Sequence, residues 1–165
     1  MIVTRLGPDD VARARAIRRR ALADAPDAFW ETLEEENARP DSDWTARLAV
    51  PEAVTFVASV DGDDVGLVIG MPHHEHAEDA GLYSMWVAPA ARGQGAGEAL
   101  ITSVIAWARA AARPTVRLDV GDANLPARRL YERMGFTPTG VVGTMPPPRD
   151  HIAEHELVLA LTPSE

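Results

Sequence analysis

A glycine-rich turn between a predicted strand and a predicted helix constrains the fold more than any other part of this sequence. Before the turn, residues 81–87 (GLYSMWV) have the aromatic and branched side chains of a buried strand. After it, apolar residues recur at helical spacing, which predicts a long helix over residues 95–112 with one apolar face. Three glycines, Gly93, Gly95 and Gly97, open this helix. The first amides of a helix lack internal partners and carry partial positive charge, so the turn predicts an anion site that suits phosphate.

The rest of the chain alternates predicted strands and helices. Residues 54–60 and 65–70, joined by a turn at 61–64, predict an antiparallel hairpin. We also expect strands at 2–5, 116–120, 139–142 and 154–161, and helices at 11–22, 26–37, 44–50 and 125–134. No repeat or linker interrupts residues 1–165. The sequence therefore predicts a single α/β domain, with a mixed central sheet of about seven strands flanked by about four helices.

The composition excludes several classes of function. The chain has no cysteine, so a disulfide, a thiolate zinc site or a cysteine nucleophile is not available. Its 16 basic residues, all arginines, face 25 Asp and Glu residues, and this acidic balance argues against a nucleic-acid partner. No apolar run approaches the ~20 residues of a membrane span, and the N-terminus lacks signal-peptide features. We therefore expect a cytoplasmic protein with no nucleic-acid and no membrane partner.

Two motifs together resemble a known family. The turn reads RGQGAG at residues 92–97 and follows WVAP at residues 86–89. It has neither the Gly-Lys-Ser/Thr of a nucleoside triphosphatase loop nor the Gly-x-Gly-x-x-Gly of a dinucleotide fingerprint. Downstream, residues 124–136 (NLPARRLYERMGF) have the pattern Asn-x-x-Ala, helix, Tyr and Gly-Phe. In this order and separation, the motifs resemble the GCN5-related N-acetyltransferase (GNAT) superfamily.

The resemblance implies the GNAT fold and acetyl-coenzyme A as the acyl donor. The amides of the turn would hold the pyrophosphate, while the preceding strand would splay from its neighbour and bond the pantetheine arm. One amide of that strand would also polarise the thioester carbonyl. Asn124 is expected to cap a helix and also to contact the arm. The residues expected to bind the cofactor are Met85, Trp86, Val87, Arg92, Gly93, Gln94, Gly95, Ala96, Gly97, Asn124, Ala127 and Tyr131.

Tyr131 and Asp119 are the candidate catalytic residues. A departing thiolate needs a proton, which a phenol can donate, and Tyr131 matches the tyrosine acid of the family in both flanks. The strand before the turn has no carboxylate to act as a base, unlike many family members. Asp119 is the nearest substitute, because some relatives that acetylate protein N-termini place a carboxylate at the equivalent position of the next strand. The alternative for Asp119 is a hydrogen-bonded structural role.

Aromatic residues in the early helical region are the candidates for the acceptor pocket. Phe29, Trp30 and Trp44 would line a pocket between these helices and the last two strands, with Glu34 in an acidic run at its border. Alternatively, the aromatic residues pack the helices onto the sheet and the acidic run is a solvated face. The run at residues 73–76 (HHEH) lacks the helical spacing that would bring metal ligands together, so we expect no metal.

These features predict an acetyl-CoA-dependent N-acetyltransferase. The acetyl group would pass to a primary amine by direct attack in a ternary complex, because no cysteine can form an acyl-enzyme. The acceptor would be a small molecule or a protein N-terminus, and many such domains form homodimers. The alternative is a catalytically weak acyl-CoA-binding or regulatory module with the same fold. The missing strand carboxylate favours that module, and the intact Tyr131 opposes it.

Overall fold

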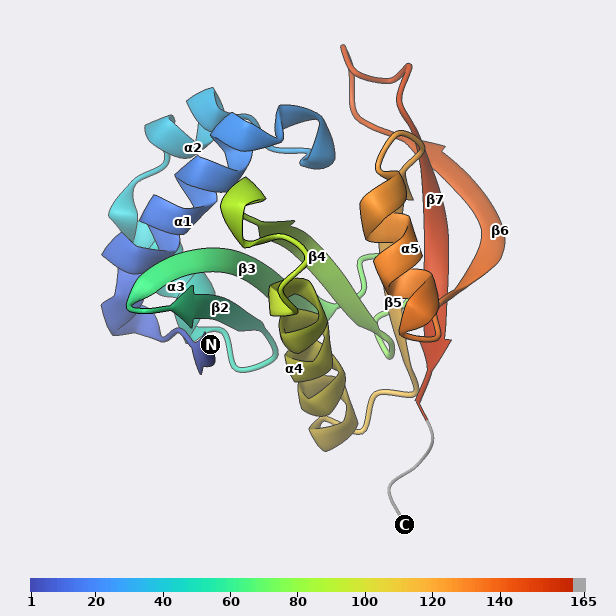
Figure 1. Cartoon of the computed structure of the whole chain (residues 1–165), viewed down its shortest axis with the longest axis horizontal. Coiled ribbons are helices and arrows are strands. Elements are labelled where there is room, and N and C mark those ends of the chain that lie inside the picture. Colours follow the sequence, from blue (N-terminus) through green and yellow to red (C-terminus); the bar gives the residue numbers. More distant parts are fainter. Residues whose placement is uncertain (162–165) are drawn as a thin grey trace.

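Seven strands form one mixed sheet in the order β1-β2-β3-β4-β5-β7-β6 in the computed structural model, which describes residues 1–161 (Figure 1). The strands are β1 (Ile2–Arg5), β2 (Val54–Val60), β3 (Asp63–Pro72), β4 (Ala80–Val87), β5 (Thr115–Gly121), β6 (Thr137–Thr144) and β7 (Ala153–Ala160). The helices are α1 (Val11–Asp24), α2 (Leu33–Ala38), α3 (Asp41–Ala49), α4 (Ala96–Ala110) and α5 (Leu125–Arg133), with 3-10 turns η1 (Pro8–Asp10), η2 (Pro26–Ala28) and η3 (Pro89–Ala91). The predicted α/β fold class with a mixed sheet is confirmed.

The predicted helical region over residues 26–37 is divided into two separate elements. The 3-10 turn η2 ends at Phe29, which is extended, and a new helix, α2, begins after Thr32. The Thr32 hydroxyl accepts from the Glu35 amide at 3.1 Å, and the Glu35 carboxylate accepts from the Thr32 amide at 3.0 Å. This reciprocal capping box fixes the start of a helix at Thr32 and so separates α2 from η2.

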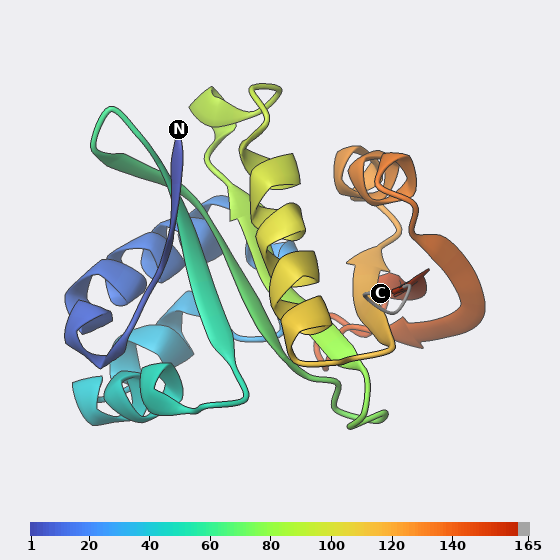
Figure 2. The same cartoon turned by 90° about the horizontal axis from the view of Figure 1, so that it is seen from below.

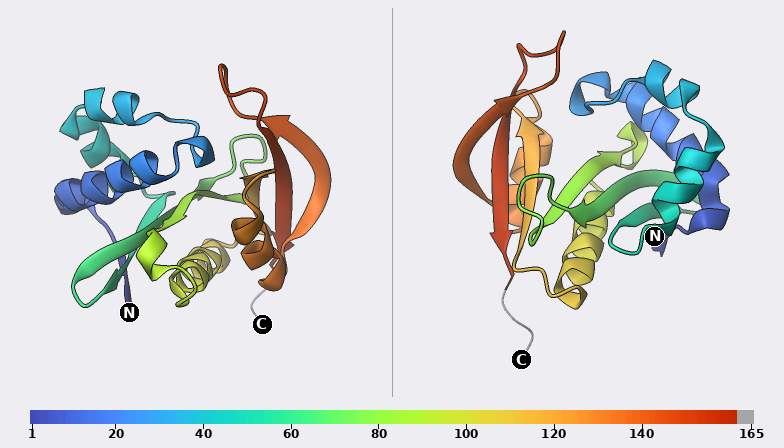
Figure 3. Two further views of the ribbon diagram at one scale, coloured as in Figure 1. Left: turned by 45° about the horizontal axis from the view of Figure 1, so that its top comes forward. Right: turned by 180° about the vertical axis from the view of Figure 1, so that it is seen from behind.

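The helices cover both faces of the sheet. Figure 3 (left) shows α1, α2 and α3 on one face and α4 and α5 on the other. Seen from below in Figure 2, α4 lies beside β2, β3 and β4, whereas α5 lies beside the β5–β7 half. The alternation of side chains along β3 serves both cores, because Leu67 packs in the cluster with α1 and the next residue, Val68, packs in the cluster with α4. Within residues 1–161, no helix combines the length and apolar character needed to cross a membrane.

The sheet opens between β4 and β5. These parallel strands pair only at Ala80–Val116 and Gly81–Arg117, and beyond these residues they diverge (Figure 1). β4 is also bulged, because the β3 pairing passes from Leu67–Trp86 to Ile69–Tyr83 and leaves two β4 residues opposite one. The splay expected from the family resemblance is therefore present.

Buried charge joins α1, α2 and α3. Glu36 is fully buried, and its carboxylate accepts from the Trp44 indole at 2.7 Å. Arg15 lies 3.4 Å from the same carboxylate and donates to the Glu36 carbonyl oxygen at 2.8 Å. Glu34, two residues earlier, is exposed. The acidic run is thus a solvated face only in part, since its third glutamate lies in the core.

Glu36→Ala should destabilise the fold strongly. It leaves the Trp44 indole without its acceptor and removes the carboxylate that compensates the buried Arg15 guanidinium, so the free energy of unfolding should fall by about 3–5 kcal/mol. Glu34→Ala is the matched control, and its effect should stay within about 0.5 kcal/mol because the side chain is exposed. Urea denaturation measures both values. Similar losses in the two variants would contradict the role assigned to Glu36.

Candidate active site

A cleft of about 2020 Å³ follows the opening between β4 and β5. Its lining comes from the η2 segment, β4 and the end of β5, from α5, and from Glu154 of β7. The glycine-rich turn before α4 borders the cleft through Arg92, Gly93, Ala96 and Gly97, whereas Gln94 and Gly95 do not line it. The structure therefore brings most of the expected donor-binding residues to one place.

The turn has the backbone conformation that its glycines permit. Gly95 is the N-cap of α4 with a φ of +90°, and Gly93 has a φ of +75°. Residues with a Cβ rarely adopt such values. A Cβ on Gly97 would lie 2.8 Å from the Leu130 side chain, so this glycine lets α4 and α5 approach. The open helix end offers backbone amides to an anion, as the sequence predicts.

The side chains of Arg92 and Gln94 brace the turn. Arg92 donates to the Val87 carbonyl at 3.0 Å and to Asp24 at 2.9 Å, and Gln94 donates to the Ala90 carbonyl at 3.0 Å. Asp24 also accepts from the Trp86 indole at 2.9 Å. Sequence reasoning missed Asp24, although an acid at the end of α1 is unfavourable for the helix dipole and so indicates a specific partner.

The bulge of β4 lies in the middle of the cleft wall. Ser84 has a φ of +57°, and it lines the cleft with Met85, Trp86 and Val87. Met85 and Val87 pack against the core under α4, and Trp86 is buried in the core under α1. Trp86 is therefore a core side chain, Met85 and Val87 are half-buried at the edge of the core, and all three residues border the cleft.

Arg18 is a buried cation at this bulge. It donates to the Ser84 hydroxyl at 2.6 Å and to Glu31 at 3.1 Å, and its guanidinium lies 4.9 Å from the centre of the Phe29 ring. Burial lowers the pKa of Arg18, and the Glu31 carboxylate counteracts this effect. Glu31 also pairs with Arg39. Arg18 was not predicted, although it directly follows Ile17 on the apolar stripe of α1.

Helix α5 supplies Tyr131, and its N-cap is Asn124. The Asn124 side chain accepts from the Ala127 amide at 3.4 Å, which confirms the N-cap, and both residues line the cleft. Tyr131 is buried, packs edge-on against Phe136 and also lines the cleft. Burial raises the pKa of the Tyr131 phenol well above its usual value, so this hydroxyl keeps its proton. Among residues 1–161, no hydrogen-bond partner of the hydroxyl is found, which leaves its proton available to a ligand.

Carboxylates of β5 and β7 share one face of the sheet. Asp119 pairs in register with Glu156, which accepts from Arg117 at 2.9 Å. Asp119 is exposed and lines the cleft, and partial desolvation together with Glu156 raises its pKa. Glu154, which sequence reasoning missed, lines the cleft and accepts from the Trp30 indole at 2.8 Å. Burial raises the pKa of Glu154, and the charge of Asp119 raises it further.

The expected acceptor residues are brought to the cleft in part. Trp30 is 55% exposed and borders it, whereas Phe29 and Trp44 line it from the core with 4% and 1% exposure. Both alternatives for the aromatic residues therefore apply to Phe29 and Trp44, which pack the helices and face the cleft. Glu34 does not line the cleft. The glutamates of this region that line it are Glu31 and Glu35.

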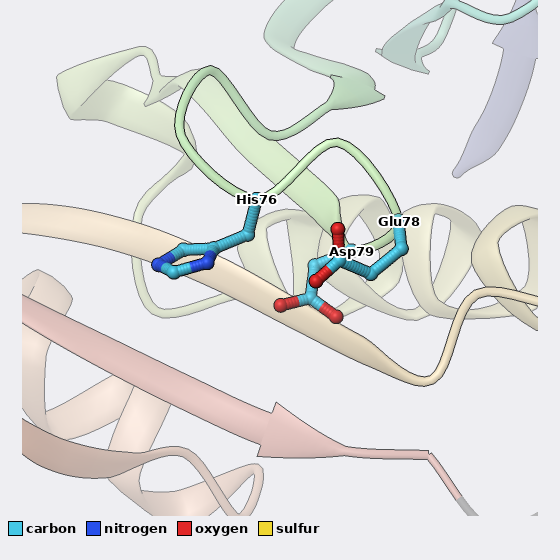
Figure 4. Close-up of side chains that lie close together, drawn as sticks. All are labelled: His76, Glu78 and Asp79. Carbon is cyan, nitrogen blue, oxygen red and sulfur yellow. The ribbon is translucent and has the colours of Figure 1, made fainter.

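The histidine-rich loop before β4 is held by protein contacts. The Nδ1 atom of His73 accepts from the amides of Glu75 and His76, and burial lowers the pKa of His73. His76 lies near Glu78 and Asp79, with potential ligand atoms within 4.8 Å of one another (Figure 4). Asp79 is already paired with Arg117 at 2.6 Å. The ion pair with Arg117 thus accounts for the buried carboxylate of Asp79.

Comparisons with known proteins agree with this geometry. The model of the acetyltransferase (GNAT) family matches residues 18–136. Mycothiol acetyltransferases from Thermomonospora curvata and Acidothermus cellulolyticus are 34% and 35% identical over 144 and 145 residues, which are 86% and 80% of this chain. The matches cover 46% and 42% of those proteins, so the chain spans less than half the length of these curated relatives.

Solved structures share the fold at low sequence identity. A ribosomal-protein-alanine N-acetyltransferase from Brucella melitensis superposes with a TM-score of 0.80 and 20% identity, covering 98% of this chain and 100% of its own. A putative acetyltransferase from Salmonella typhimurium with its cofactor acetyl-CoA gives a TM-score of 0.78 and 19% identity, covering 100% of this chain and 96% of its own. The family match covers both the turn and the Tyr131 region. The chain therefore belongs to the GNAT family of acetyltransferases, whose acetyl donor is acetyl-CoA.

Proposed function

We propose that this chain transfers the acetyl group of acetyl-CoA to a primary amine by direct attack in a ternary complex. The observation that carries the proposal is the meeting of three features in one cleft: the glycine-rich turn, the opening between β4 and β5, and Tyr131. The family match supports an acetyltransferase. The names of the relatives refer to different chemistry, mycothiol in one case and a ribosomal-protein alanine in the other, so they do not select an acceptor.

In this proposal the donor lies along the opening between the strands. The amides at residues 92–97 bind the pyrophosphate, and the backbone of Met85, Trp86 and Val87 bonds the pantetheine arm. Asn124 and Ala127 border the arm from the opposite wall. Arg129 and Arg133 also line the cleft on α5 and add positive charge near the phosphates.

The reaction requires proton transfers at the nitrogen and at the sulfur. The amine nitrogen attacks the thioester carbonyl carbon, the carbon–sulfur bond breaks, and Tyr131 donates a proton to the departing thiolate. The attacking nitrogen loses its remaining excess proton as the amide forms, and this proton restores the Tyr131 phenol by way of solvent. An ammonium must first lose a proton, and Asp119 accepts it in this scheme. A backbone amide next to the β4 bulge stabilises the developing oxyanion. Asp119 thus takes the role that many family members give to a carboxylate on β4.

The acceptor end of the cleft favours a cation. Asp119 and Glu154 line it from β5 and β7. Glu156 lies on the same face of the sheet, and its carboxylate is paired with Arg117. Trp30 adds a half-exposed aromatic face beside Glu154. An ammonium is attracted both by carboxylates and by an indole ring. This combination suits an acceptor that arrives protonated.

A cytoplasmic location and a homodimer are further proposals, which come from the sequence.

The proposed activity is tested by release of free thiol from acetyl-CoA. The panel should contain small amines, amino acids, aminoglycosides, peptides with a free N-terminus and the acceptor of mycothiol acetyltransferases. We expect turnover with one class and acetylation of its amino group by mass spectrometry. Tight binding of acetyl-CoA in calorimetry without turnover on any acceptor would instead favour the acyl-CoA-binding module.

Tyr131→Phe should lower turnover without weakening donor binding. The ring and its packing on Phe136 remain, while the proton donor is lost, so kcat should fall by about 10²–10⁴-fold. The Kd for CoA, measured by calorimetry, should stay unchanged. A thioester of a more acidic thiol should react with a smaller defect, because its thiolate leaves without a proton. Equal losses in kcat and in CoA affinity would rule out the acid role.

Asp119→Asn and Glu154→Gln should separate the base from the second carboxylate. Asp119→Asn should lower kcat by about 10²-fold or more and remove the limb of the pH profile on which kcat falls as Asp119 becomes protonated. Because the pKa of Asp119 is raised, that limb should lie above the usual range for an aspartate. Glu154→Gln is the matched control and should mainly raise the KM for the amine. The opposite pattern would assign the base to Glu154.

A further inference from the structure

Arg18 stands apart from the rest of the cleft because it is a buried cation that reaches the β4 bulge. It is 7% exposed, and its Nε atom has no hydrogen-bond partner within residues 1–161. Its terminal nitrogens point to different elements, one to Ser84 at 2.6 Å and the other to Glu31 at 3.1 Å. The Arg18–Ser84 contact links residues 66 positions apart and so ties α1 to the middle of β4.

Ser84 has a backbone conformation that needs external support. Its φ of +57° lies in the left-handed region, where a side chain with a Cβ is strained. It lies within the bulge, where Ser84 and Met85 together occupy the space opposite Val68. A bulge redirects the residues that follow it, so the course of the backbone at Met85 and Trp86 depends on this conformation. Within residues 1–161, the Ser84 hydroxyl makes its side-chain hydrogen bond with Arg18.

We propose that Arg18 is a positioning residue that holds the β4 bulge through the Ser84 hydroxyl, and thereby fixes the backbone of Met85 and Trp86 against the thioester. This inference rests on the proposed function. A guanidinium suits the role because its fixed, planar fork bonds Ser84 and Glu31 at once. Glu31, which also pairs with Arg39, compensates the buried charge and connects the bulge to α2. Phe29 covers the guanidinium from the cleft side of η2.

Comparing Ser84→Ala with Ser84→Gly separates the effect of the Arg18–Ser84 hydrogen bond from the effect of the backbone conformation at residue 84. Both variants lose the hydroxyl, but glycine adopts a positive φ without strain whereas alanine does not. We expect Ser84→Ala to lower kcat by about 10²-fold, the scale of a small misplacement at a reacting centre, and Ser84→Gly to retain most of the rate. The Kd for CoA should stay near the wild-type value in both variants, and the Tm should fall by a few degrees in both, because each leaves the same buried Arg18 nitrogen without its acceptor.

Arg18→Met tests the donor itself, and Arg19→Met is its matched control. Arg19 is the next residue of α1 and is exposed. Arg18→Met should lower kcat as Ser84→Ala does, but it should cost much less in the Ser84→Gly background, since the two residues act as one unit. If Arg18→Met does not fold, the serine variants still test the proposal.

Hydrogen exchange measures the local stability of the bulge and does not require turnover. Exchange at the Met85 and Trp86 amides should be faster in Ser84→Ala and Arg18→Met than in Arg19→Met, because the support of the bulge is lost. If the wild type acetylates no amine, the proposed function fails while this measurement still judges the positioning role. Equal kcat in Ser84→Ala and Ser84→Gly, or exchange in Arg18→Met no faster than in Arg19→Met, would overturn the proposal.

Discussion

The short pairing between β4 and β5 determines the rest of the site. Only two residues of each strand pair, after which the strands diverge and a cleft follows the opening. A sheet interior normally uses its backbone donors and acceptors within the ladder, so strands that separate need another partner. In a GNAT acetyltransferase, the pantetheine arm of the donor suits that need, because it carries amide groups. The turn before α4 and the first turns of α5 lie at the two sides of this opening.

Helix α1 supports the opening from the other face of the sheet. Asp24 at its end joins the Trp86 indole to Arg92, and Arg18 reaches the bulge at Ser84. Both contacts place charge close to β4 residues that line the cleft. Buried or strained groups persist only where their surroundings compensate them, and Glu31 supplies that compensation for Arg18. The early helices therefore do more than shape an acceptor pocket.

The local parts of the site could be predicted from the sequence. The glycines at residues 93–97 and the Asn124 cap depend on neighbouring residues, so their spacing predicts their geometry. Asp24, Arg18 and Glu154 could not be predicted in this way, because their partners lie far along the chain. The Trp30–Glu154 contact, for example, spans 124 positions. The helical region over residues 26–37 is divided because the chain is extended at Phe29 and the Thr32–Glu35 capping box starts a new helix.

A crystal structure with bound CoA tests the central claim most directly. We predict that the pantetheine arm lies between β4 and β5, pairs with the backbone at Met85–Val87, and places its sulfur within hydrogen-bond reach of the Tyr131 hydroxyl. The pyrophosphate should meet the amides of residues 92–97. CoA bound elsewhere, or β4 and β5 closed against each other with the sulfur remote from Tyr131, would contradict this account of the cleft.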